Sequence, residues 1–181
     1  MRERDRNRSE MPWHVVVAVE DVAETGERMT LVADAETRLA IARMAGLREL
    51  PRLEANFELL RQGGGGLRVT GRVSAMVGQN CVVTLEPVQN EIEEDVDLLY
   101  MPAAAAAATD GETPAEAKWD HPEPLIGGAV DLGALATEFL ILGIDPYPRK
   151  AGATFEPLRD QNPDPGPFAA LAGLIKDRDG H

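Results

Sequence analysis

LEANFELLRQGGGGLRVTGRVSA, residues 53–75, is the segment that predicts the strand arrangement of this chain most directly. On both sides of the four glycines at 63–66, apolar side chains alternate with polar ones. A period of two is typical of strands with one buried face, because successive side chains of a strand point to opposite sides. The glycine run suits the turn between two such strands. The stretch therefore predicts an antiparallel hairpin with Arg68 and Arg72 on the polar face of its second strand.

Toward the N-terminus, the sequence predicts two more strands and a helix. Residues 13–19 and 29–33 are rich in apolar and β-branched side chains, as strands are. Asp34 stands where a helix N-cap belongs, ahead of the partly apolar segment 35–45. Gly46 follows this segment, at the position where a glycine commonly ends a helix.

Toward the C-terminus, residues 78–80 predict a second turn, residues 81–85 a strand, and residues 88–100 a further strand. Asp131 is the predicted N-cap of a helix that continues to Leu142, with apolar residues spaced three and four apart. The predicted fold class is α+β, an antiparallel β-sheet with two or three packed helices and a flexible acidic, alanine-rich insert.

The domain organisation follows from composition. Residues 1–10 are polar and without apolar periodicity, and we expect a disordered tail. Residues 11–176 are predicted to form a single domain, which ends in a short amphipathic helix at 168–176. Within it, residues 102–123 contain six consecutive alanines and little else to bury, which predicts the flexible insert. Residues 177–181 are a second polar tail.

The charge of the chain is acidic and unevenly distributed. The formal net charge is −13 over 181 residues. Residues 35–72 hold seven arginines against four carboxylates, a local net of +3. Residues 86–138 hold thirteen carboxylates against one lysine, a local net of −12. Because phosphate binding needs basic groups, such a chain could bind nucleic acid only through its arginine-rich segment, whereas the acidic segment could bind a basic protein.

Two sets of residues are candidates for binding. The neighbourhood of the arginines holds one aromatic residue, Phe57, so base stacking is not supported, and two interpretations stay open: contact with an RNA backbone, or ordinary surface arginines. Alternate carboxylates on one strand share a face and repel one another, which predicts either a solvated face or a docking face for a basic protein. The candidate RNA-contacting residues are Arg38, Arg48, Arg52, Arg61, Arg68 and Arg72, and the candidate protein-binding residues are Glu91, Glu93, Asp95 and Asp97.

Catalysis, metal binding and cofactor binding find little support. Cys81 is the single cysteine, so the chain has no internal disulfide, and we expect a reducing, cytoplasmic location without a signal sequence or membrane span. No histidine lies near Cys81 in sequence to activate it, which makes a thiol enzyme the weaker hypothesis. His14, His121 and His181 are too scattered to hold a metal. The glycine run joins two strands and lacks the context of a phosphate-binding loop.

Several segments of this chain follow one another in a particular order, among them GQNCVVTLEPV at 78–88, DLGAL at 131–135 and DPYPR at 145–149. Together they resemble the YceD-type family of bacterial proteins, which are needed for accumulation of large-subunit ribosomal RNA. GQNCVVTLEPV, residues 78–88, is similar to the central motif of the family, a cysteine strand followed by Leu-Glu-Pro-Val. The order and spacing of later segments resemble its second block, and the closing segment resembles the tail of alphaproteobacterial members. These later segments are Glu123-Pro124-Leu125, DLGAL at 131–135, Glu138-Phe139-Leu140, DPYPR at 145–149 and PFAAL at 167–171.

The resemblance covers roughly residues 14–176 and implies a non-enzymatic ribosome-biogenesis factor that supports accumulation of large-subunit (23S) ribosomal RNA. Many relatives carry a Cys-x-x-Cys pair at the central motif and another cysteine near the proline pair. Here Thr84 and the Arg149-Lys150 pair stand in those places, so no metal-binding role is carried over. The direct partner stays open between a basic ribosomal protein, a large-subunit precursor and ribosomal RNA. The alternative function is a general protein-interaction adaptor unconnected with ribosomes.

Overall fold

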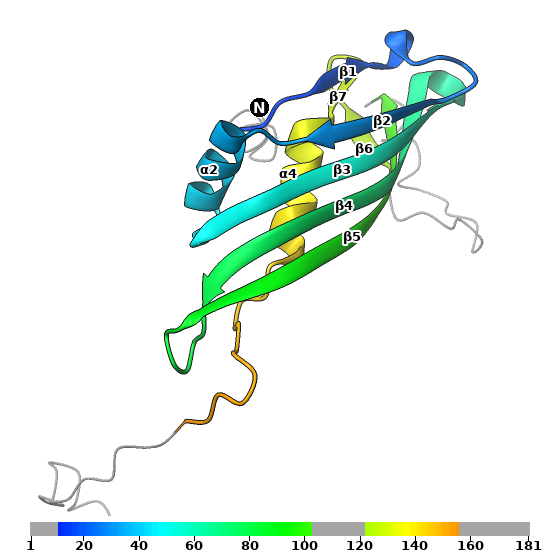
Figure 1. The fold of residues 1–181 in the computed structure, drawn as a ribbon. Coiled ribbons are helices and arrows are strands. Elements are labelled where there is room, and N and C mark those ends of the chain that lie inside the picture. The colour runs from blue at the N-terminus through cyan, green and yellow to red at the C-terminus, as the bar shows by residue number, and fades with distance from the viewer. Residues whose placement is uncertain (1–10, 103–121, 156–181) are drawn as a thin grey trace, which may run out of the picture.

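A computed structural model describes residues 11–102 and 122–155 and arranges them as a long, curved β-sheet with helices (Figure 1). The main sheet has five strands in the order β2-β3-β4-β5-β6, and β1 and β7 form a separate pair. The strands are β1 (Val16–Ala18), β2 (Glu27–Val32), β3 (Glu49–Gln62), β4 (Gly66–Asn80), β5 (Pro87–Pro102), β6 (Glu123–Leu125) and β7 (Ala129–Asp131). The helices are α2 (Ala35–Met44) and α4 (Leu132–Gly143), with short 3-10 turns η1 (Val19–Asp21) and η2 (Gly63–Gly65).

The hairpin predicted from residues 53–75 is confirmed as β3 and β4. The two strands pair antiparallel from Gln62 opposite Gly66 down to Arg52 opposite Met76. Gly64 and Gly65, in η2 between them, have φ angles of +76° and +78°, which glycine adopts without strain. Within β4, Gly71 serves a different purpose, because a Cβ atom there would lie 2.0 Å from the backbone oxygen of Asn56. The glycines of this hairpin thus serve both its turn and a close approach of its strands.

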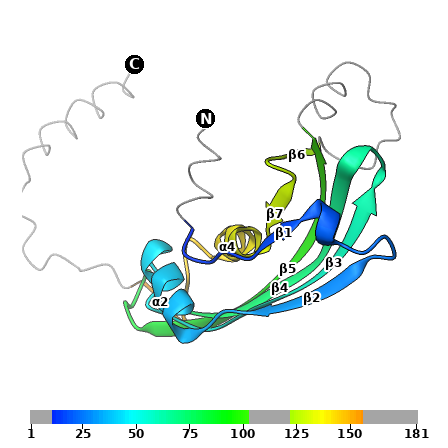
Figure 2. The same ribbon diagram turned by 90° about the horizontal axis from the view of Figure 1, so that it is seen from above.

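Both predicted helices with aspartate N-caps are confirmed, and the fold class is α+β. The Asp34 side chain accepts a hydrogen bond from the Thr37 N–H at the start of α2 (2.8 Å), and Gly46, with φ +66°, follows the end of this helix. Asp131 caps α4 through the N–H groups of Gly133 and Ala134, each at 3.1 Å. Figure 2 shows that the main sheet is curved and that α4 lies in its hollow.

The core lies between the concave face of the sheet and α4. Thr137 is the single buried polar residue among the described residues, and its hydroxyl donates to the Gly133 carbonyl oxygen in the preceding turn of the helix (2.9 Å). The convex face carries the polar residues of the alternating strands. Side chains with no exposed surface in this core include Leu53, Leu59, Leu67, Val69, Val73, Leu132, Leu135 and Leu140.

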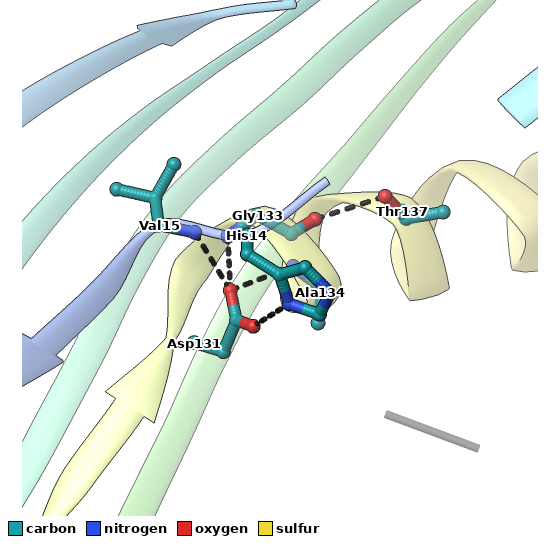
Figure 3. A network of polar contacts seen from close by, with 6 residues as sticks. All are labelled: His14, Val15, Asp131, Gly133, Ala134 and Thr137. Carbon is teal, nitrogen blue, oxygen red and sulfur yellow. Dashed lines mark hydrogen bonds and ion pairs between the residues drawn. The ribbon is translucent and has the colours of Figure 1, made fainter. Parts of the chain in front are cut away.

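The carboxylate of Asp131 connects the N-terminal segment to the start of α4 through hydrogen bonds (Figure 3). Asp131 Oδ1 accepts the Val15 N–H at 2.9 Å as well as the two helix N–H groups, and Oδ2 lies 2.6 Å from His14 Nδ1. Burial of Asp131 acts to raise its pKa, but the hydrogen bonds from His14, Val15 and Ala134 outweigh burial and lower it. Gly133 allows the contact, because a Cβ there would lie 2.7 Å from the Trp13 carbonyl oxygen.

Two predictions around the cysteine are wrong. Residues 78–80, predicted as a turn, continue β4 and pair with β5 as far as Asn80 opposite Pro87. Residues 81–85, predicted as a strand, form the turn itself: the Leu85 N–H donates to the Cys81 carbonyl oxygen (2.9 Å), and the φ of Leu85 is +62°, a value that excludes a strand. Gly78 marks close packing instead of a turn, because a Cβ there would lie 2.3 Å from Glu49 Cγ.

Several predictions fall on residues that the structure does not describe. The tails at 1–10 and 177–181 and the short helix at 168–176 lie outside the described residues, as does most of the predicted insert. At the two ends of that insert, Pro102 completes β5 and Glu123 begins β6, which pairs in parallel with the end of β5. Neither α2 nor α4, the α-helices of the described part, has the length and apolar character needed to cross a bilayer.

Candidate functional site

The convex face of the main sheet carries most of the candidate binding residues. Even-numbered residues of β4 and odd-numbered residues of β5 point to this face, because their neighbours in sequence form the buried core on the other side. Arg72 lies directly opposite Asp95, and Thr70 lies opposite Asp97. The sheet therefore places members of the arginine set beside the carboxylate set.

Three arginines bind the four carboxylates across the strands. Arg52 Nη2 lies 2.7 Å from Glu91 Oε1. Both Nε and Nη2 of Arg68 donate to the carboxylate of Asp97, each at 3.1 Å. Arg72 donates from Nε to Asp95 at 2.8 Å and lies 3.5 Å from Glu93 through Nη1. We call this group the charge ladder; its members are Arg52, Arg68, Arg72, Glu91, Glu93, Asp95 and Asp97.

The electrostatics of the ladder differ from what the chain segments predict. The sequence indicated an arginine-rich and an acidic region that act separately, and the ladder corrects this, because β3, β4 and β5 lie side by side. Four carboxylates against three guanidinium groups leave a local net charge of −1. The side-chain hydrogen bonds to Asp97 and to Asp95 raise the pKa of Arg68 and of Arg72, so both arginines stay charged.

The other three candidate arginines lie apart from the ladder. Arg38, in the first turns of α2, donates from Nη1 to the carbonyl oxygen of Ala33. Arg48 and Arg61 lie at opposite ends of β3, the first just before the strand and the second opposite Leu67 near the η2 turn. The six arginines therefore do not form one basic surface.

The side chain of Cys81 lies in a buried site at the β4–β5 turn. Its Sγ accepts hydrogen bonds from the N–H groups of Val83 and Thr84 at 3.4 Å and of Lys150 at 3.3 Å. The Lys150 N–H, followed by the hydrogen bonds from Thr84, lowers the pKa of the thiol to about 6, although burial acts in the opposite direction. The thiolate form is therefore stabilised by backbone N–H groups and by the Thr84 side chain.

This site joins the turn to the segment that follows α4. The Val82 N–H donates to the Pro148 carbonyl oxygen (2.9 Å), and Lys150 Nζ lies 3.1 Å from Glu86. The structure thus brings together Cys81, Thr84 and Lys150, the places where many relatives are expected to carry cysteines. Sequence reasoning missed this contact. The only signal for it was that many relatives are expected to carry cysteines in both motif blocks, which suggests that the two blocks lie close together.

Metal ligation has no candidate in the part of the chain that the structure describes. Within residues 11–102 and 122–155, no three His, Cys, Asp or Glu side chains are grouped so that they could hold an ion. Cys81 has backbone N–H groups around its sulfur, and His14 is engaged with Asp131. Cys81 thus connects the turn with the later segment through the Lys150 N–H.

Comparison with known protein families gives a match over the later part of the chain. The sequence model of the family described as "Large ribosomal RNA subunit accumulation protein YceD" matches residues 69–174, more than half of the chain. The match includes most of β4, all of β5, the Cys81 site and α4, but not Arg52 or Arg68 of the charge ladder. Neither the curated proteins nor the solved structures contain a significant match. On the family match, the chain belongs to the YceD family of large ribosomal RNA subunit accumulation proteins.

Proposed function

We propose that this chain is a non-enzymatic ribosome-biogenesis factor of the bacterial cytoplasm that supports accumulation of large-subunit (23S) ribosomal RNA. It acts by binding a basic ribosomal protein, free or within a large-subunit precursor, in preference to naked RNA. Membership of the family supports the role in ribosomal RNA accumulation. The choice of a protein as the direct partner rests on the charge ladder.

The observation that carries this choice is that the arginines of the convex face already have carboxylate partners. Arg68 binds Asp97 with two hydrogen bonds, and Arg72 reaches both Asp95 and Glu93. A phosphate group that approached these arginines would have to displace the carboxylates and then lie beside them. Nucleic-acid affinity depends on cations that release counterions from phosphate, and arginines paired within the protein supply little of this. A cation of a basic protein need not displace the arginines, because a carboxylate accepts several hydrogen bonds and the four carboxylates lie on β5, the outer strand of the ladder.

The geometry of Cys81 supports a role without catalysis. A catalytic thiol needs access to substrate and a base within hydrogen-bond reach. Cys81 is buried, and the groups that bind its sulfur are backbone N–H groups of Val83, Thr84 and Lys150. We therefore assign the low thiol pKa to the structural contact.

Sedimentation of cell extracts tests the proposal. The full chain, tagged and expressed at its natural level, should migrate in part with large-subunit precursors, and loss of the gene should lower large-subunit relative to small-subunit ribosomal RNA. A chain found only in the unbound fractions, together with an unchanged RNA ratio under several growth conditions, would favour an adaptor unconnected with ribosomes. Crosslinking of the precursor fraction should recover the chain on a protein more efficiently than on RNA.

A further inference from the structure

Over most of its length, strand β5 has a partner strand on only one side within the described residues. It pairs with β4 from Pro87 to Tyr100, whereas β6 pairs only with its last three residues, Tyr100, Met101 and Pro102. Residues 88–99 have no backbone hydrogen-bond partner on the second side within the described part of the chain. Figure 1 shows β5 along the border of the sheet, with α4 behind it rather than beside it. We call residues 88–99 the open edge.

The register shows which residues direct their backbone groups to this edge. The Gly78 carbonyl oxygen of β4 accepts from the Arg48 N–H (2.9 Å), so even-numbered residues of β4 face β3. Odd-numbered residues of β4 then face β5, where their partners are even-numbered, as Ala75 is opposite Ile92. The odd-numbered residues of β5 therefore direct N–H and C=O outward; among them are Glu91, Glu93, Asp95 and Asp97.

The two faces of the open edge differ in chemical character: the convex face is acidic, and the concave face is apolar apart from Asn90 and Glu94. On the convex face stand the four ladder carboxylates, with exposed fractions of 46% to 77%. On the concave face, Ile92 and Val96 are buried in the core and Leu98 packs against it. A strand added at this edge would present alternate side chains to these two surfaces, cationic ones to the first and apolar ones to the second.

The same carboxylates disfavour the binding of a second copy of the chain at this edge. Antiparallel pairing of two open edges would place Glu91, Glu93, Asp95 and Asp97 of one copy against those of the other, and like charges opposite one another destabilise a strand pair. The arginines of the ladder reach the carboxylates from the β4 side. Because a carboxylate accepts several hydrogen bonds at once, the outward side of each carboxylate can still accept from the side chains of an added strand.

We propose that the open edge of β5 binds an extended protein segment in which Lys or Arg alternates with apolar residues, by adding it to the sheet as a further strand. This inference rests on the proposed function, since it names the part of a basic protein that the chain would recognise. The backbone of the segment pairs with the odd-numbered residues of β5, and its cations lie beside the carboxylates that these same residues carry. Strand addition at a sheet edge is a general mode of peptide recognition.

A synthetic peptide of about eight residues, with Lys and Val in alternation, is the probe, and its affinity for the full chain is measured by calorimetry. The peptide should bind, more weakly at high salt, and about tenfold more tightly than a peptide of the same composition with its lysines and valines in two blocks. The segment pairs antiparallel with β5, as β4 does on the other side, so its Lys residues lie opposite Glu and Asp with their N–H groups toward β5, and the N–H groups of Val face away. Methylation of the Lys backbone nitrogens should weaken binding by about tenfold or more, whereas methylation of the Val nitrogens should leave it nearly unchanged.

The matched variants are Glu93→Pro and Glu93→Gln. Both remove the carboxylate, but only the proline removes an edge-facing N–H, and proline is tolerated on edge strands where its missing N–H faces outward. The proline variant should bind the peptide about tenfold more weakly than the glutamine variant. If Glu93→Pro does not fold, the methylated peptides decide alone. Equal affinity for the two methylated peptides, or no binding of the unmethylated one, overturns the inference. A chain that fails the peptide test but migrates with large-subunit precursors would contradict only the open-edge inference and would leave the proposed function supported. A chain that binds the peptide but does not migrate with the precursors would contradict the proposed function and would leave the open-edge inference supported.

Discussion

Replacement of Asp131 by Ala tests how the N-terminal strand and α4 are held together. The carboxylate accepts from the N–H groups of Val15, Gly133 and Ala134 at 2.9 to 3.1 Å and contacts His14 at 2.6 Å. Loss of a helix N-cap costs about 1 kcal/mol, and each further hydrogen bond of a part-buried group contributes about 1 kcal/mol. We expect the Ala variant to lose about 2–4 kcal/mol of unfolding free energy, measured by urea denaturation.

The control is Asp34→Ala, which removes the other aspartate N-cap. Asp34 is exposed, and its side chain caps α2 through the Thr37 N–H, a partner within the same helix. Its replacement should therefore cost clearly less stability than that of Asp131. Equal losses for the two variants would refute the view that Asp131 fastens β1 and the preceding residues to α4.

The pH dependence provides a second check on Asp131. Its pKa is lower in the folded chain than the ordinary value of 3.8, because the hydrogen bonds outweigh burial. The stabilisation by the carboxylate is thus complete above the unfolded pKa and is lost as the pH falls through the lower, folded pKa. The difference in stability between the natural chain and Asp131→Asn should shrink between about pH 5 and about pH 2. A difference that stays constant over this range would show that the charge of Asp131 is irrelevant.

Three further predictions concern the strand crossing, the thiol and metal content. Gly71→Ala should destabilise the chain by about 2–4 kcal/mol in denaturation experiments, because its Cβ would meet the Asn56 oxygen, while Gly63→Ala, with nothing within 4 Å, should be nearly neutral. Cys81→Ala should speed amide hydrogen exchange at Lys150 by about tenfold, since that N–H loses its sulfur acceptor, and Cys81→Ser should do so less; unchanged exchange in the Ala variant would contradict the contact. Elemental analysis of the purified chain should find far less than one zinc or iron per chain, as no metal-ligand group is present within the described residues.

The parts of the fold that sequence reasoning predicted are those determined by local chemistry. The β3–β4 hairpin follows from alternation around a glycine turn, and α2 and α4 follow from an aspartate N-cap ahead of an apolar stripe. Asp131 was found as a cap, but its bonds to His14 and Val15 join residues more than 100 positions apart, which no local pattern indicates.

The misplaced turn explains why the charge ladder was not predicted. Residues equally far from the centre of a hairpin turn face each other, so a turn centred on residue 79 would place Glu86 opposite Arg72. The observed turn comes after Asn80, and the residue opposite Arg72 is Asp95. The β-branched residues Val82 and Val83 favoured a strand, but no strand of the described residues pairs with them, and the backbone N–H of Val82 donates to the Pro148 carbonyl oxygen. A shift in register thus changed which charges are neighbours.

Substitutions within the charge ladder can distinguish a protein partner from an RNA partner. Arg68→Gln with Arg72→Gln removes two of three guanidinium groups and takes the local charge from −1 to −3, whereas Gln or Asn at Glu91, Glu93, Asp95 and Asp97 takes it to +3. The two variants therefore move the potential of one face in opposite directions.

A basic protein should associate faster and more tightly with the arginine variant than with the natural chain, and hardly with the carboxylate variant, with both differences reduced at high salt. Naked RNA should show the reverse order. The measurement is the association of each folded variant with purified large-subunit precursors, with Arg61→Gln, which lies outside the ladder, as the control. If the arginine variant binds precursors less well and the carboxylate variant better, RNA is the direct partner, because only a polyanion is repelled by the carboxylates that the first variant leaves unpaired.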